Sequence, residues 1–222
     1  MKGIEGYLHT NVRIKQDAAM GIGVMIIFIA MVLTAGIVAY VILSTGSLLE
    51  NQSGSTGTQT IKEVSSGLKV STIQGHNSLG LIDKIVILIT PRAGSPEIDL
   101  NGVLIELSES NQKNILKYSS SNWVDGRTGL TSLFDVNAFS SASSEFGAIV
   151  LVDDDSSCFQ TTPVVNRGDS VMLAINTTAI FGGINENVNI VGNVIPEEGA
   201  WCIIQFRTPS SFVNPILILQ EE

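Results

Sequence analysis

The hydrophobic positions of the chain gather first in one uninterrupted run from Gly21 to Leu43, which contains 23 residues and no charge. Thr34 and Tyr40 are its polar side chains. No polar position recurs at the 3.6-residue period, so the pattern predicts a helix that is hydrophobic on all sides. About 20 apolar residues are enough to cross a bilayer as a helix. We therefore expect lipid or other protein to surround this segment.

The pattern changes after the helix. Residues 50–60, ENQSGSTGTQT, are polar and rich in Gly, Ser and Thr, which predicts a flexible linker. Short apolar or alternating runs then follow, separated by Gly, Asn and Pro, and they are typical of the strands of an immunoglobulin-like β-sandwich. About eight strands are expected, at residues 68–73, 85–90, 103–107, 146–152, 171–175, 188–195, 201–206 and 212–219, with a turn at 75–77.

The predicted fold class is therefore α+β, with a long N-terminal hydrophobic helix at 19–49 followed by a β-sandwich at 61–222. Composition agrees with this division, since the 222 residues include 21 Gly and only 6% aromatic and 15% charged residues. The formal net charge of −9 argues against a nucleic-acid partner, which requires a basic surface. His9 and His76 are the two histidines, too few for a histidine-based active site, so we expect no enzyme.

Residues 1–18 precede the apolar run and carry Lys2, Arg13 and Lys15 against two carboxylates. A weakly basic segment in front of an apolar helix favours an N-terminus held in the cytoplasm. An ordinary secretory signal peptide is the alternative, but it has an apolar core of only 7–15 residues followed by a small-residue cleavage site. This run is longer and continues into STGSLLE, so the helix is expected to stay on the mature protein.

Residues 19–33, AMGIGVMIIFIAMVL, resemble the N-terminus of the archaeal flagellins, or archaellins. Four blocks near the C-terminus resemble the end of the same family in the same order: GDSV at 168–171, VIPEEGA at 194–200, FRTPS at 206–210 and the closing Leu219-Gln220. The resemblance covers about half of the chain. It implies a structural subunit of the archaeal flagellum filament, which polymerises through its N-terminal helix and serves swimming motility.

The resemblance also implies a class III, prepilin-type leader at residues 1–18. A membrane peptidase would cut it on the cytoplasmic side, between Ala18 and Ala19. Gln16, Asp17 and Ala18 stand where the family usually has basic residues and Gly. The implied partners are this peptidase, the membrane assembly machinery and other copies of the chain. The implied location is the membrane before assembly and the extracellular filament afterwards.

Three other features invite a chemical interpretation. Asp153, Asp154 and Asp155 follow a predicted strand and could offer hard oxygen ligands to Ca²⁺, but they lack the alternating spacing of an EF-hand loop. They are weak candidates for a structural metal, beside the alternative of a solvated acidic turn. No other cofactor is expected.

The two cysteines, Cys158 and Cys202, would close a loop of about 45 residues if oxidised, which restricts the unfolded chain by about 4 kcal/mol. A buried free thiol is the equal alternative for each. Asn51 and Asn176 fit the N-x-[ST] sequon and are candidate N-glycosylation sites, although such sequons also arise by chance.

Two further functions stay open beside the archaellin. One is an archaeal type IV adhesive pilin, and the other is a single-pass anchor that presents an immunoglobulin-like binding module. Cleavage before the apolar helix favours a filament, whereas a retained N-terminal segment favours the anchor.

Overall fold

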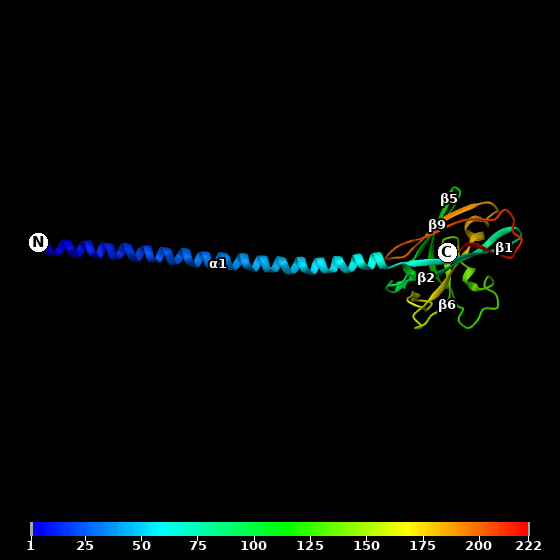
Figure 1. Ribbon diagram of the computed structural model, residues 1–222, viewed down its shortest axis with the longest axis horizontal. Coiled ribbons are helices and arrows are strands. Elements are labelled where there is room, and N and C mark those ends of the chain that lie inside the picture. The colour runs from blue at the N-terminus through cyan, green and yellow to red at the C-terminus, as the bar shows by residue number, and fades with distance from the viewer. Residues whose placement is uncertain (1, 222) are drawn as a thin grey trace. The chain divides into compact units, whose positions relative to one another are not determined.

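The computed structural model describes residues 2–221, with side chains from Ala18 onward, and contains a long helix and a β domain (Figure 1). The chain divides into two compact units, Met1–Gly57 and Thr58–Glu222. The division falls inside the long helix, at the segment of low apolar content. The predicted α+β class, a long helix followed by a β-sandwich, is confirmed.

Helix α1 runs over Lys2–Ser65, 64 residues that would extend about 96 Å at 1.5 Å per residue. It contains the predicted hydrophobic helix and continues beyond it in both directions. Its sparse polar side chains bond within the helix. Thr34 Oγ1 donates to the Ala30 carbonyl at 2.9 Å, and Thr45 Oγ1 donates to the Val41 carbonyl at 2.8 Å.

The linker expected at residues 50–60 is wrong as a description of secondary structure, because this segment is part of α1. Extending an existing helix adds one hydrogen bond for each residue fixed, whereas starting a helix is costly. The segment also holds no proline, and Ser65 Oγ donates to the Ile61 carbonyl at 2.8 Å in the last turn. The helix ends instead before Gly67, whose φ of 147° favours glycine.

The domain after α1 contains eleven strands and three short helical segments within the described residues. The strands are β1 (Leu68–Ser78), β2 (Leu81–Pro91), β3 (Ile98–Asp99), β4 (Leu104–Glu109), β5 (Gln112–Asp125), β6 (Glu145–Val152), β7 (Val164–Val165), β8 (Ser170–Asn176), β9 (Asn189–Ile195), β10 (Cys202–Arg207) and β11 (Ile216–Glu221). The helical segments are η1 (Leu100–Gly102), η2 (Asn137–Phe139) and α2 (Thr177–Phe181).

Nine strands form one sheet in the order β10-β9-β4-β5-β6-β8-β2-β1-β11, and β3 pairs separately with β7. All pairs are antiparallel except β5 with β6, which is parallel. The two ends of the sheet meet, because the Gln205 backbone N–H donates to Gln220 Oε1 at 3.0 Å. Near them, Cys202 Sγ donates to the Leu68 carbonyl at 2.7 Å. The two layers of the sandwich therefore belong to one curled, barrel-like sheet.

The sheet encloses one large hydrophobic core, to which strands of both layers contribute. Phe146, Leu68, Ile105 and Leu173 are fully buried in it. A second, smaller cluster lies on the outer face of β2, β6 and β8, where Phe134 and Phe139 cover Val86, Ile149 and Ala174. The segment between β5 and β6 therefore covers one outer face of the sandwich.

All eight predicted strands are present, although their bounds differ by a few residues. The turn expected at 75–77 is wrong, because β1 continues to Ser78 and the chain reverses at Leu79-Gly80. Strand β5 was not predicted, since Lys117 to Asn122 lack the apolar alternation that marks a strand. The short β3, β7 and α2 were also missed.

Candidate functional site

The surface of α1 is the first candidate site. Its large apolar side chains between Met20 and Leu49 are 50–75% exposed. Within the described chain, Ala18–Ser65 is the one helix long and apolar enough to cross a membrane, with a mean hydropathy of 2.8 and none of its most apolar window buried. Nothing in residues 18–57 covers this surface, so it requires lipid or other protein chains around it.

Small residues interrupt the apolar surface of α1 at Ala30, Ala35, Gly36 and Ala39. A side chain added at Gly36 would meet no atom within 4 Å. Small residues allow the backbones of neighbouring helices to approach closely. The surface can therefore pack against similar helices as well as against lipid.

The expected cleavage residues lie on this same helix. Ala18 and Ala19 are both exposed, and α1 continues through them without a break.

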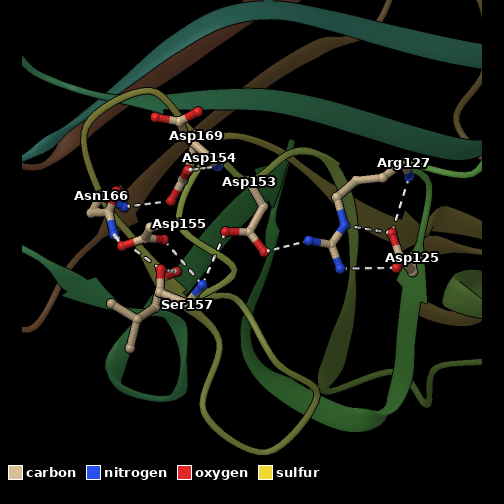
Figure 2. Close-up of polar contacts among 9 residues, drawn as sticks. Asp125, Arg127, Asp153, Asp154, Asp155, Ser157, Asn166 and Asp169 are labelled. Carbon is tan, nitrogen blue, oxygen red and sulfur yellow. Dashed lines mark hydrogen bonds and ion pairs between the residues drawn. The ribbon is translucent and has the colours of Figure 1, made fainter.

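The second candidate site is an acidic cluster in the loops after β6 and before β8 (Figure 2). Asp153, Asp155 and Asp169 each offer a carboxylate oxygen, and these three atoms lie within 4.8 Å of one another. Asp169 is only 2% exposed, and the Asp153 side chain is 1% exposed, while Asp155 faces solvent. Two buried carboxylates beside a third therefore concentrate negative charge in a small volume.

Backbone and side-chain donors hold these carboxylates in place. The Ser157 N–H donates to both Asp153 Oδ1 and Asp155 Oδ1 at 3.0 Å. Asn166 donates its backbone N–H to Asp169 Oδ2 at 2.8 Å and its side-chain amide to Asp155 Oδ2 at 2.6 Å. The bonds from Ser157 and Asn166 lower the pKa of Asp155 because they stabilise its ionised form. These donors therefore favour the ionised form of Asp155.

A single guanidinium joins the cluster to the end of β5. Arg127 Nη1 donates to Asp153 Oδ2 at 2.9 Å, and its Nε and Nη2 donate to Asp125 at 2.9 and 3.0 Å (Figure 2). The hydrogen bonds from Arg127 lower the pKa of Asp125. Because one cation serves two carboxylates, a net negative charge remains on the cluster.

This donor set fits a hard divalent cation such as Ca²⁺, which binds carboxylate and carbonyl oxygens. It lacks the Cys and His ligands of a structural zinc site. The carboxylates that the structure brings together differ in one residue from the expected set of Asp153, Asp154 and Asp155. Asp154 is exposed and contributes its backbone N–H, which donates to Asp169 Oδ1 at 3.1 Å. Asp169 replaces it, although sequence reasoning did not select Asp169 as a ligand.

Asp169, Asn166, Arg127 and Asp125 are therefore the cluster members that sequence reasoning missed. They lie well outside the acidic triplet along the chain, so no local pattern links them to it. The signal available was Asp169 itself, a carboxylate in the GDSV block just before a buried strand.

Both cysteines are buried and no disulfide joins them in the structure, so the disulfide alternative is not formed there. Cys202 Sγ donates to the Leu68 carbonyl at 2.7 Å, which joins β10 to β1. Burial, reinforced by the charges of Asp153 and Asp169, raises the pKa of Cys158 to about 12. Such a thiol remains protonated and unreactive at neutral pH.

The two sequon asparagines occupy different environments. Asn51 is exposed on α1. Asn176 is half-buried and caps α2, since its Oδ1 accepts the Ala179 N–H at 3.1 Å and its Nδ2 donates to the Phe139 carbonyl at 3.1 Å. A glycan on Asn176 Nδ2 would have to replace that bond, so Asn51 is the better acceptor of the two.

Comparison with known proteins gives a consistent result. The family model for archaeal-type flagellin matches residues 18–206. Flagellin B2 of Methanocaldococcus jannaschii is 40% identical over 204 residues, which are 91% of this chain and 94% of that protein. Flagellin B3 of Thermococcus kodakarensis is 33% identical over 256 residues, covering 93% of this chain and 99% of that protein.

Solved structures agree. The crystal structure of archaeal flagellin FlaB1 from Methanocaldococcus jannaschii matches with a TM-score of 0.64 at 34% identity, covering 70% of this chain and 98% of that one. A chain of the archaeal flagellum of Methanospirillum hungatei strain JF1 shares the fold, with a TM-score of 0.63 at 19% identity over 89% of this chain and 99% of that one. The resemblance found in residues 19–33 and in the C-terminal blocks is thereby confirmed, and the chain belongs to the archaeal-type flagellin family.

Proposed function

We propose that this chain is the structural subunit of an archaeal flagellum filament and serves swimming motility. The observation that carries the proposal is the uncovered apolar surface of α1 between Met20 and Leu49. Membership of the flagellin family supports the same role and favours a structural protein over an enzyme.

Self-association is the means by which α1 leaves water in the filament. Burying one Leu- or Ile-sized side chain contributes about 1.5–3 kcal/mol. The segment from Met20 to Leu49 carries well over a dozen large apolar side chains. Even after the cost of ordering them, a bundle of such helices is strongly favoured over helices exposed to water.

The same surface accounts for a membrane stage before assembly. A bilayer can hold the helix until it transfers to a growing filament, whose β domains then lie outside the cell. The transfer requires that the polar segment 1–18 be removed, and we propose cleavage between Ala18 and Ala19 by a prepilin-type peptidase. The AMGIG block at 19–23, which resembles the start of the mature archaellins, supports this position.

The acidic cluster would serve as a structural brace in the assembled filament. Asp153, Asp155 and Asp169 would hold a hard divalent cation, which would supply positive charge to three converging carboxylates. The chain's own contribution is to fix the loops through Ser157, Asn166 and Arg127, as Figure 2 shows.

Electron microscopy of filaments sheared from cells that produce this chain as their sole flagellin tests the proposal. Mass spectrometry of the filaments should identify the chain, and the cells should swim. Filaments on cells that adhere but do not swim would favour an adhesive pilin. A chain that stays in the membrane with residues 1–18 intact, without filaments, would favour an anchored binding module.

A further inference from the structure

One outer face of the β domain carries no covering segment within the described residues. It is formed by β10, β9, β4 and the first half of β5, which are consecutive in the sheet. The residues of this outer face, taken from the register and from the alternation of burial, are Ile203, Gln205 and Arg207 of β10, Asn189, Val191, Asn193 and Ile195 of β9, Leu104, Glu106 and Ser108 of β4, and Lys113, Ile115 and Lys117 of β5, with Trp201 just before β10.

Large apolar side chains stand out on this outer face. Trp201 is 62% exposed, Ile203 61%, Ile115 53% and Val191 48%. Cross-strand pairing places Ile203 opposite Asn193, Asn193 opposite Glu106, and Glu106 opposite Ile115, so these side chains lie on one surface.

The fold does cover another part of the outer surface of the sheet. Phe134 and Phe139 of the segment between β5 and β6 cover the outer face of β2, β6 and β8. In the part of the chain that the structure describes, no such segment packs on Ile203, Val191 or Ile115. These apolar side chains therefore stay in contact with water until a partner covers them.

Charge indicates the kind of partner. Glu106 is the one carboxylate among the outer-face strand residues given above, and Lys113 Nζ pairs with it at 2.8 Å. Lys117 and Arg207 add positive charge at the margins of the same face, whereas the whole chain carries −9. This face therefore attracts an acidic protein such as another copy of this chain.

We propose that this outer face of β10, β9, β4 and β5 binds the β domain of a second copy of the chain in the filament. The inference rests on the proposed function, because it requires the filament that α1 builds. A head-to-tail contact of this kind joins two different surfaces of the chain. When it is repeated along a helix it forms an open filament instead of a closed ring. The patch alone is small, so the contact depends on the high local concentration of domains that the α1 bundle provides.

Thiol protection in assembled filaments tests the contact directly. In filaments of the full-length Ile203→Cys variant, we expect a maleimide reagent to label the introduced thiol at least tenfold more slowly than in the detergent-solubilised subunit. Leu79→Cys is the matched control, since Leu79 is 102% exposed at the turn between β1 and β2 and should label at similar rates in both states. The native thiols are buried and give little background. Equal labelling of the Ile203→Cys variant in both states would overturn the proposal.

A second variant tests whether the contact stabilises the filament. Trp201→Glu with Ile203→Glu places two carboxylates on the face, and we expect shorter filaments that dissociate at a lower temperature than those of the parent chain. Leu79→Glu, which adds a carboxylate elsewhere, should leave length and dissociation temperature unchanged. Variant filaments as long and heat-resistant as the parent would refute the inference. Failure of the parent chain itself to form filaments would instead refute the proposed function.

Discussion

Arg127 and Asp153 form an ion pair in which a partly exposed guanidinium faces an almost completely buried carboxylate. The Nη1 and Oδ2 atoms lie 2.9 Å apart, and the two side chains are 32% and 1% exposed. Arg127 comes from the segment after β5 and Asp153 directly follows β6, so the pair joins the acidic cluster to the parallel part of the sheet. A buried charge requires a partner of opposite sign.

Replacing Arg127 by Gln should therefore lower the Tm of the full chain in detergent and make it more dependent on calcium. In this variant Asp153 no longer has the Arg127 guanidinium beside it. A divalent ion bound to Asp155 and Asp169 can partly take the place of that positive charge. Thermal unfolding with a chelator and then with millimolar CaCl₂ measures both effects. Arg167→Gln is the control, because Arg167 is exposed close to the cluster in sequence and lies outside its hydrogen bonds. An unchanged Tm of the Arg127 variant under both conditions would contradict the proposed brace.

We expect the chain to lose stability at alkaline pH because the thiol of Cys158 is protonated in the folded state. Burial raises its pKa from the ordinary value of 9.0 to about 12 in the folded state, so the folded chain holds a proton that the unfolded chain releases. Stability is then fully present below pH 9 and declines as the pH rises toward 12. Burial raises the pKa of Tyr118 as well, so it contributes to the same decline above about pH 10.

Urea unfolding at pH 8, 9.5 and 10.5 measures this decline. The Cys158→Ala variant should be less stable at pH 8 but should lose less stability between pH 8 and 10.5 than the parent chain. Cys202→Ala, which removes the other buried thiol, is the comparison. If the free energy of unfolding falls equally with pH in all three proteins, Cys158 is not the cause of the alkaline loss of stability.

Asn176 should behave as a structural residue and Asn51 as a modification site. Asn176→Ala removes the cap of α2 and the bond to the Phe139 carbonyl, so we expect a loss of about 1–2 kcal/mol in the free energy of unfolding. Asn51→Gln should leave stability unchanged and reduce the subunit mass by one glycan in the native host. A mass reduced by Thr178→Ala but not by Ser53→Ala would reverse this assignment.

The mature chain should begin at Ala19. Intact-mass measurement and N-terminal sequencing of filament subunits decide this, since a cut after Ala18 removes the polar stretch that precedes the apolar run. Because Asp17 stands where the family usually has a basic residue, Asp17→Lys should increase the rate of cleavage, while Asp17→Asn provides the comparison for loss of charge alone. A mature terminus beyond Ser44 would be incompatible with a helix that assembles the filament.

The sequence predicted the elements whose side chains follow a simple period. The apolar run at Gly21–Leu43 and the buried strand at 85–90 were found because burial on all sides leaves long apolar runs. Strand β5 was not predicted, because Lys117 to Asn122 lie on a strand that is largely exposed and has no apolar alternation. Its strand conformation depends on pairing with β4 and β6. The helical state of residues 50–60 was not predicted, because the composition of a segment describes it in isolation. In the protein this segment extends a helix that is already formed.

The candidate cation site was predicted in part for a similar reason. Asp153 and Asp155 are close neighbours along the chain and stand out as an acidic run. Asp169 and Arg127 reach them only because β5, β6 and β8 are adjacent in the sheet. No local sequence pattern indicates which strands are adjacent in the sheet. The sequence therefore predicted two of the three carboxylates, but neither Asp169 nor the Arg127 guanidinium that faces Asp153.

The last prediction separates the roles of the helix and the β domain. Residues 61–222 should form a folded, mainly β monomer when expressed alone, because the buried core begins at Ser66 and Leu68 and includes no earlier described residue. The apolar outer face around Ile203 is too small to hold two free domains together. Restoring residues 19–60 adds the exposed apolar surface of α1, and the longer chain should polymerise or aggregate.

Circular dichroism and light scattering on the two proteins make the comparison, and a third protein sharpens it. In residues 19–222 with Ile27→Glu and Val38→Glu, two carboxylates enter the apolar surface of α1, and burying them unpaired in a helix bundle is costly. We expect this variant to keep the β spectrum of the parent domain and to lose assembly. If residues 61–222 are unfolded, or build filaments by themselves, assembly does not reside in α1.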